Sequence, residues 1–228
     1  MKPLLGVIGG LGPLATLKFY ELLMKAQHAE TEQDYLDVLI YSKPSVPDRT
    51  AYIIGESDAD PFESLLDAGK VLEQAKVQAI AMPCVTAHFF YEKLARQINA
   101  PFIHIVEETA KDIQARGIKK AGLLATDGTL QAGLFDGTMK KCGIEIIKTT
   151  DDEQKTLMEI IYLSLKRGEN LHKNILGRIA NNLTIRGAET VILGCTELSL
   201  AAEGLNMALT DPLAVLAKAS LKVCGYAD

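Results

Sequence analysis

The sequence predicts an α/β protein of two similar parallel-sheet domains, related by a pseudo-twofold duplication, that face each other across a cleft. Short apolar runs alternate with segments of helical period, which is typical of βα units on a parallel sheet. "GVIGGLGPLATLKF" from Gly6 aligns without gaps with "GLLATDGTLQAGLF" from Gly122, at an offset of 116 residues. Cys84 and Cys195 follow similar apolar runs 111 residues apart. Offsets near half the chain length indicate a duplicated domain rather than a solenoid repeat.

Four apolar runs in each half predict strands. In chain order they cover residues 4–9, 36–41, 79–82, 102–105, 121–125, 144–148, 190–193 and 208–210. Apolar side chains at three- and four-residue steps predict two of the helices between them, through Leu65, Ala68, Leu72 and Ala75, and through Leu171, Ile175, Ile179 and Leu183. We expect these helices to cover the sheets.

No low-complexity linker separates the two halves. We expect a first domain of residues 1–105 plus 209–228 and a second of residues 106–208. The chain would cross between them near Ile105, and its last helix would return to pack on the first domain.

Composition excludes several classes of partner. A net charge of −5, few aromatic residues (6%) and no run of Lys or Arg argue against nucleic acid. The apolar stretch after Lys2 is interrupted by glycines and Pro13, unlike a signal peptide, and no apolar run is long enough to span a membrane. The four cysteines are dispersed without a CxxC pair, so we expect neither a zinc site nor disulfide bonds. We therefore expect the protein to work in the reducing cytoplasm. A small molecule is the partner class that remains.

Cys84 and Cys195 are the strongest candidates for chemistry. Each follows a predicted strand and precedes a predicted helix, at the sheet edge where ligands of open α/β sheets collect. Ionising a free thiol at pH 7 costs about 2 kcal/mol, which a helix N-terminus and one nearby cation could supply. A lone cysteine is more often a buried packing residue, but two at matched strand ends favour catalysis. Cys142 and Cys224 lack this setting and are predicted to pack.

The first glycine-rich turn has two functional interpretations. Gly10, Gly12 and Ala15 match the GxGxxA pattern of dinucleotide sites, but the second strand ends in "YSK", without an acidic residue for the ribose. We favour a backbone nest at Gly10, Leu11 and Gly12 that binds a carboxylate, matched in the other half by the turn at residues 127–129. A simple tight turn stays open as the third interpretation.

Four motifs in order resemble the aspartate/glutamate racemase family: "GVIGGLGP", "PDRT" at residues 47–50, "MPCVTAH" at 82–88 and "GCTEL" at 194–198. The resemblance covers essentially the whole chain and is greatest to the aspartate racemase branch. It implies a cofactor-independent enzyme with two α/β domains, the site between them, and a homodimer. It also implies that Cys84 and Cys195 are catalytic, that Arg49 binds the substrate carboxylate and that Lys166 adds a second cationic contact.

The remaining predicted substrate contacts are the backbone nests at Gly10, Leu11 and Gly12 and at Thr129, the hydroxyls of Thr50, Thr86 and Thr196, and Val85 and Glu197 at positions of the family motifs. The family usually has Asn directly after the first cysteine, and Val85 cannot make that hydrogen bond. An unpaired substrate group there would cost about 1–3 kcal/mol, which leaves aspartate, glutamate or another substrate open. His88, one helical turn from Cys84, is expected to support that cysteine.

Inversion of an amino acid requires two acid/base groups on opposite faces of the α-carbon, and two thiols across a cleft suit that task. The carbanion must be stabilised by preorganised donors in a dry site. We therefore expect a racemase acting on aspartate, with glutamate next, without metal or other cofactor. A related hydantoin racemase or arylmalonate decarboxylase, a non-catalytic acidic amino acid binder and a nucleotide-binding oxidoreductase are the alternatives.

Overall fold

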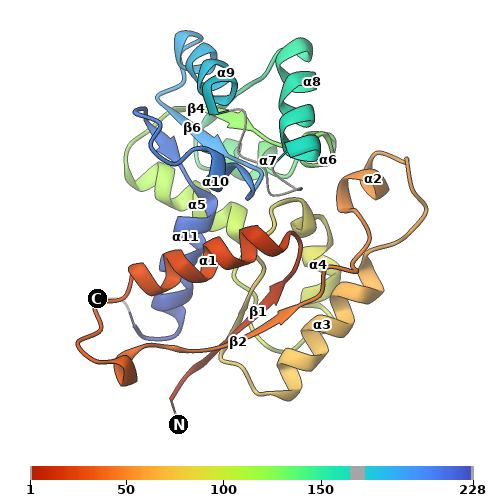
Figure 1. Cartoon of the computed structure of the whole chain (residues 1–228), viewed down its shortest axis with the longest axis vertical. Helices are drawn as coiled ribbons and strands as arrows, with labels where there is room; N and C mark the ends of the chain where they lie inside the picture. Colours follow the sequence, from red (N-terminus) through yellow and green to blue (C-terminus); the bar gives the residue numbers. More distant parts are fainter. Residues whose placement is uncertain (1, 165–172, 227–228) are drawn as a thin grey trace.

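Two parallel β-sheets organise the chain, which the computed structural model describes over residues 2–164 and 173–226. The first sheet has the strand order β2-β1-β3 and the second the order β5-β4-β6-β7 (Figure 1). Every pair of neighbouring strands is parallel. The strands are β1 (Leu4–Gly9), β2 (Asp37–Ser42), β3 (Ala79–Ala81), β4 (Lys120–Leu124), β5 (Glu145–Lys148), β6 (Thr190–Leu193) and β7 (Leu209–Thr210).

The sheets repeat one topology, as the sequence duplication predicts. β1 and β4 carry the aligned Gly6 and Gly122, and each lies between the second and third strands of its own half. Cys84 follows β3 and Cys195 follows β6, so the two cysteines occupy equivalent strand ends. The predicted fold class of two parallel-sheet α/β units is confirmed.

Helices cover both sheets (Figure 1). Those up to the crossover are α1 (Pro13–Lys25), the 3₁₀ helix η1 (Glu32–Asp34), α2 (Arg49–Ile53), α3 (Phe62–Gln74), the 3₁₀ helix η2 (Thr86–Phe90), α4 (Tyr91–Ala95) and α5 (Ile105–Ala115). Those that follow are α6 (Asp127–Gln131), α7 (Asp136–Lys141), α8 (Asp151–Glu159), the π-helix η3 (Ile160–Ser164), α9 (Lys173–Ile185), α10 (Leu198–Ala201) and α11 (Pro212–Val223).

The predicted strand at residues 102–105 is wrong. Phe102 forms only an isolated bridge with Ile80, the Ile103 N–H donates to the Ile80 carbonyl, and the chain leaves the sheet at His104. His104 is the N-cap of α5, accepting from the Glu107 N–H, and the helix begins at Ile105. A side chain that caps a helix start diverts the chain before a strand can extend. The other predicted strands are present, within one residue at each end.

The last helix joins the two units. α11 packs against α1 and α5, and one apolar core cluster includes Val7 of β1, Leu123 of β4 and Leu216 of α11. Lys18 of α1 also pairs with Glu203, which follows α10. These contacts fix how the carboxyl ends of the two sheets face each other.

The apolar stripes predicted for two helices largely face the core. Leu65, Ala68 and Leu72 of α3 are buried, whereas Ala75 lies just past the end of the helix and is exposed. In the second stripe Ile179 and Leu183 of α9 are buried, Ile175 is partly buried, and Leu171 lies outside the described residues.

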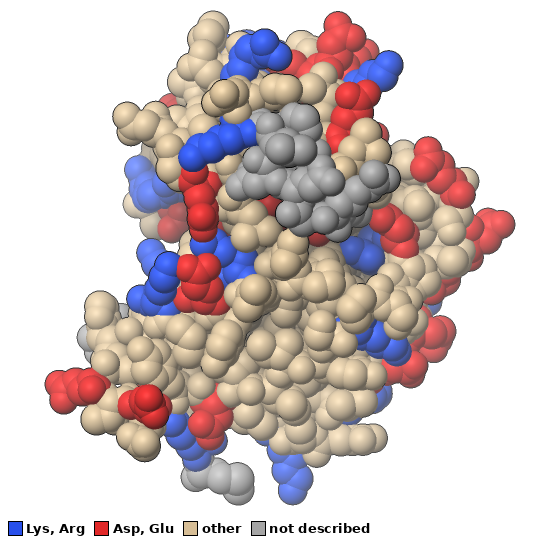
Figure 2. Space-filling model, viewed as in Figure 1, with Lys and Arg blue, Asp and Glu red and all other residues tan. Residues whose placement is uncertain are grey.

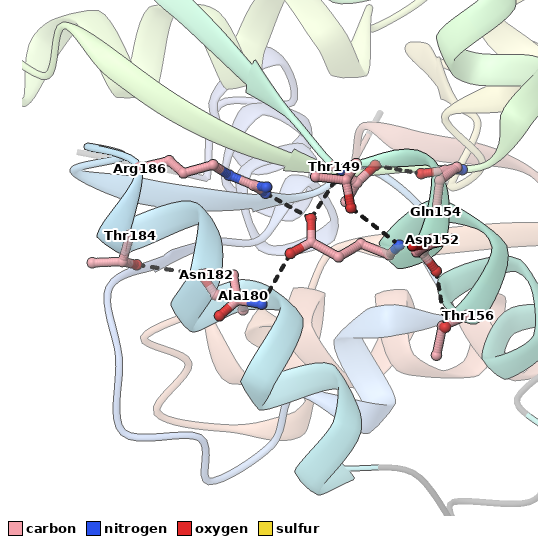
Figure 3. Close-up of polar contacts among 10 residues, drawn as sticks. Thr149, Asp152, Gln154, Thr156, Ala180, Asn182, Thr184 and Arg186 are labelled. Carbon is pink, nitrogen blue, oxygen red and sulfur yellow. Dashed lines mark hydrogen bonds and ion pairs between the residues drawn. The ribbon is translucent and has the colours of Figure 1, made fainter.

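A polar network holds α8 against α9 (Figure 3), and further bonds hold α8 against the loop after β4. Glu153 accepts from Asn182 at 2.9 Å and from Arg186 at 2.7 Å. The neighbouring Gln154 donates to the carbonyl of Ala125 at 3.0 Å and to Asp127 at 2.7 Å. Burial would raise the pKa of the Glu153 carboxyl. The Thr150 N–H and the side chains of Arg186 and Asn182 donate to it and lower that pKa below its usual value. The network therefore positions the loop that flanks the cleft.

The face viewed in Figure 1 carries Lys and Arg interleaved with Asp and Glu, around a broad uncharged area on the lower unit (Figure 2). In the described part of the chain, no helix is both long enough and apolar enough to cross a membrane.

Candidate active site

Glycines in the turn after β1 allow other parts of the chain to approach the turn closely. Gly10 has a φ of +86°, and a Cβ there would stand 2.5 Å from the backbone nitrogen of Lys43. The Gly10 N–H donates to the hydroxyl of Thr16 at 2.9 Å, so it serves the turn itself. A Cβ on Gly12 would stand 2.8 Å from Oε1 of Glu197. Gly12 thus leaves room for a carboxylate from the other unit.

Arg49 is held by backbone carbonyls at the start of α2. Its Nη2 donates to Leu11 at 2.8 Å and its Nη1 to Pro47 at 3.1 Å. Its Nε is buried without a hydrogen-bond partner among the described residues. Burial lowers the pKa of the guanidinium, but the charge and hydrogen bonding of the Cys84 side chain and the charge of the Asp48 carboxylate outweigh it and raise that pKa above its usual value. The cation is therefore fixed beside the first cysteine.

Cys84 follows β3 and is buried, with its backbone oriented by His88. Nδ1 of His88 lies 2.9 Å from the Cys84 carbonyl, and Nε2 lies 3.3 Å from the Ile105 N–H. Nδ1 therefore carries the proton and donates it, and Nε2 accepts. Burial, with a contribution from His104, lowers the pKa of His88 to about 3. His88 is neutral and links the cysteine loop to the start of α5.

Cys195 has a carboxylate as its neighbour. Its Sγ donates to Oε2 of Glu197 at 3.1 Å, and the Thr196 hydroxyl lies 3.3 Å from the same oxygen. All three side chains are buried. The two cysteines therefore differ electrically, because Cys84 lies beside a cation and Cys195 beside an acidic group.

Three buried threonines join the two units. The hydroxyl of Thr86 in η2 lies 3.0 Å from that of Thr126 and 2.9 Å from that of Thr129. Thr126 and Thr129 are 3.1 Å apart at the start of α6. Nearby, a Cβ on Gly128 would stand 2.8 Å from Cα of Thr50, so the two backbones pass in close contact.

A second polar link crosses the cleft. The hydroxyl of Tyr162 in the π-helix η3 lies 3.1 Å from each oxygen of Asp48. Asp48 also caps α2, accepting from the N–H groups of Thr50 and Ala51. Both units therefore supply the polar groups around Arg49. Lys166, the second predicted cation, lies outside the described residues.

Both thiols line one small cavity between the units, of about 10 Å³, with Leu11, Asp48, Arg49, Thr50, Thr86, Thr126 and Glu197. That volume suffices for about one water molecule. A neighbouring cavity of about 240 Å³ shares Asp48, Arg49 and Glu197 with it. A cavity of about 830 Å³ lies elsewhere, among side chains of α1, α5 and α11 such as Lys25, Glu108 and Lys222, and neither Cys84 nor Cys195 lines it.

The structure brings most of the predicted site residues together. Leu11, Arg49, Thr50, Thr86, Glu197 and both cysteines line the small cavity, Gly10 and Gly12 line its neighbour, Thr129 lies behind Thr86, and Thr196 touches Glu197. Val85 is apart from them, packed in the apolar core and lining neither cavity. The described residues contain no cluster of His, Cys, Asp or Glu suited to a metal ion.

The helices after the cysteines are shorter than expected. η2 is a 3₁₀ helix of five residues and α10 has four residues. Such short helices have few aligned peptide dipoles, so the side chains of Arg49 and Glu197 dominate the electrostatics at the thiols.

Three residues of the site were not among the predicted ones. Asp48 lies in the quoted motif "PDRT", and its position before a helix start is a signal for an N-cap. Thr126 has the same capping role for α6 and could have been found in the same way. Tyr162 carries no sequence signal, because a π-helix is not predicted from apolar spacing.

Comparison with known proteins agrees with this arrangement. The sequence profile described as Asp/Glu/Hydantoin racemase matches residues 8–220. The chain belongs to this family. This match confirms the resemblance found in the sequence. At the level of the family it also confirms the predicted enzyme class, a racemase and thus an isomerase.

Individual relatives cover nearly the full length. The broad specificity amino-acid racemase RacX of Bacillus subtilis is 29% identical over 225 residues, which is 96% of each chain. The aspartate racemase of Picrophilus torridus has a TM-score of 0.88 at 26% identity, over 98% of this chain and 94% of its own. An aspartate racemase homologue from Pyrococcus horikoshii has a TM-score of 0.79 at 29% identity, over 99% and 100% of the two chains.

Proposed function

We propose that the protein inverts the α-carbon of an amino acid by proton transfer between Cys84 and Cys195. The observation that carries the proposal is that both thiols line one small cavity between the two units. We place the substrate's α-carbon in this cavity, with one thiol on each of its faces. Two acid/base groups placed in this way can remove a proton from one side and return one from the other.

The neighbours of the thiols assign their resting roles. The guanidinium beside Cys84 favours its thiolate, and Cys195 donates its S–H proton to Glu197. In one direction the Cys84 thiolate takes the α-proton and the Cys195 thiol gives its own proton to the opposite face. The products are a Cys84 thiol, a Cys195 thiolate and the inverted amino acid. The enzyme is ready for another turnover in the same direction once the Cys84 thiol has lost a proton to water and the Cys195 thiolate has gained one from water.

Substrate contacts follow from the charges in the cavity. The unpartnered Nε–H of Arg49 is a donor for a substrate carboxylate, and the carboxylates of Asp48 and Glu197 attract the substrate ammonium. Because the cavity admits about one water in this structure, the units must separate slightly to admit an amino acid. Closing again would leave the carbanion among fixed donors with little water.

We propose aspartate as the first substrate, with glutamate next. Arg49 suits a carboxylate, and the Picrophilus relative is an aspartate racemase. We also propose that the enzyme needs no cofactor and works in the cytoplasm as a homodimer. Sedimentation velocity of the purified protein tests the dimer.

Proton NMR of L-aspartate in D₂O tests the function, using protein dialysed against a chelator and free of pyridoxal phosphate. We expect the α-proton signal to disappear while D-aspartate accumulates. Saturable binding without deuterium exchange would instead identify an amino acid binder. An unchanged spectrum for every amino acid tried would disprove the proposal.

A further inference from the structure

The cavity of about 240 Å³ adjoins the cysteine cavity. It is lined by Gly10, Gly12, Pro13, Leu14, Pro44, Val46, Asp48, Arg49 and Glu197. Three of these, Asp48, Arg49 and Glu197, also line the cysteine cavity. A ligand whose α-carbon lies between the thiols can therefore extend past these three side chains into the larger space, which we name the side chamber.

The outer walls of the side chamber are apolar. They consist of Pro13 and Leu14 at the start of α1, and of Pro44 and Val46 in the loop after β2. Val46 is buried, so this part of the wall is fixed by packing. The absence of a side chain on Gly12 keeps the passage beside Glu197 clear, because even a Cβ there would contact the carboxylate.

Charge in the side chamber is confined to its inner end. Among the described residues that line it, Arg49 is the single cation, and both of its terminal nitrogens already donate to backbone carbonyls. The carboxylates of Asp48 and Glu197 lie at the same end. The described outer walls therefore provide no cation that could bind a side-chain carboxylate of the substrate. They do provide an apolar surface against which methylene groups of a substrate can pack.

We propose that the side chamber binds the side chain of neutral aliphatic amino acids longer than aspartate, so that this enzyme racemises them as well. The inference depends on the proposed function, because it places the reacting carbon between the same two thiols. Each methylene removed from water contributes about a fourfold gain in transition-state binding. The rate should therefore rise with side-chain length until the chamber is full.

The test is α-proton exchange in D₂O with L-alanine, L-2-aminobutyrate, L-norvaline and L-norleucine, beside L-aspartate and L-glutamate. We expect kcat/KM to rise along the aliphatic series by about fourfold for each methylene. Exchange of aspartate and glutamate alone would overturn the inference and leave the proposed function standing. Exchange of no amino acid would remove the proposed function itself.

Variants at Leu14 establish where the longer side chain lies. Leu14→Trp fills the chamber and should lower kcat/KM for norleucine at least tenfold more than for alanine, and Leu14→Ala should give a smaller loss of the same kind. The control is Leu17→Trp, which makes the same change on an exposed position of α1 that does not line the chamber. An equal loss for norleucine and alanine in Leu14→Trp would show an access path rather than a side-chain site, contrary to the proposal.

Discussion

The thiol of Cys195 donates to Oε2 of Glu197 at 3.1 Å, inside a buried pocket where Thr196 contacts the same oxygen. Cys84 lies instead beside the guanidinium of Arg49, which lines the same cavity. The two thiols thus have unlike partners although they occupy equivalent strand ends. The proposed division into a thiolate and a thiol rests on this asymmetry.

Glu197→Gln should slow racemisation. The amide keeps the shape of the side chain but removes the negative charge that accepts the thiol proton. A hydrogen bond to a charged group is worth about 1.5–3 kcal/mol, so we expect kcat to fall about 10- to 100-fold with a smaller change in KM. The pH dependence of kcat should also change. Steady-state racemisation measures both, with exposed Glu145→Gln as the control, and a wild-type rate in Glu197→Gln would contradict the role.

Gly12→Ala should reproduce much of that loss by a steric route. The new Cβ would stand 2.8 Å from Oε1 of Glu197, so the carboxylate must move away from Cys195. We expect a drop in kcat of about tenfold or more. Gly137→Ala is the matched control, because no atom lies within 4 Å of its added Cβ. Activity in Gly12→Ala equal to that of the control would show that the position of Glu197 is unimportant.

Thr86→Val should weaken the contact between the units. The valine retains the volume but loses a hydroxyl that lies within 3.0 Å of both Thr126 and Thr129. We expect the free energy of unfolding to fall by about 1–2 kcal/mol, measured by urea denaturation. In a double-mutant cycle with Thr129→Val, the double variant should lose less free energy of unfolding than the two single variants lose together. Strict additivity would argue that the threonines do not act together.

His88 should make the protein less stable in acid. Its pKa is about 3 in the folded protein, against an ordinary value of 6.5, so below pH 6.5 the unfolded chain binds a proton that the folded chain does not. Its stabilising contribution is complete above pH 6.5 and falls by up to about 1.4 kcal/mol per pH unit down to pH 3.

Urea unfolding of the wild type and His88→Gln between pH 7 and pH 4 measures this contribution. The variant should show a shallower loss of stability as the pH falls, whereas the exposed His28→Gln should follow the wild type. Parallel curves for the wild type and His88→Gln would mean that His88 titrates normally.

Much of the architecture follows from local patterns in the sequence. Apolar runs located the strands because parallel strands buried on both faces are continuously apolar, as in the fully buried β6. The strand expected at residues 102–105 failed because the His104 cap diverts the chain, an effect that hydrophobicity does not reveal. Local sequence patterns also could not predict which residues from distant parts of the chain contact each other. Tyr162 reaches Asp48 across the cleft, and Val85 packs into the core, because of how the two sheets face each other.

The most direct test of the two-thiol account is racemisation by Cys84→Ala and Cys195→Ala, followed by chiral separation of aspartate, with Cys142→Ala as the control. The account predicts that each of the first two variants forms no detectable D-aspartate from L-aspartate while its thermal midpoint stays close to that of the wild type, and that the control remains active. Racemisation at the wild-type rate by either Cys84→Ala or Cys195→Ala would contradict it.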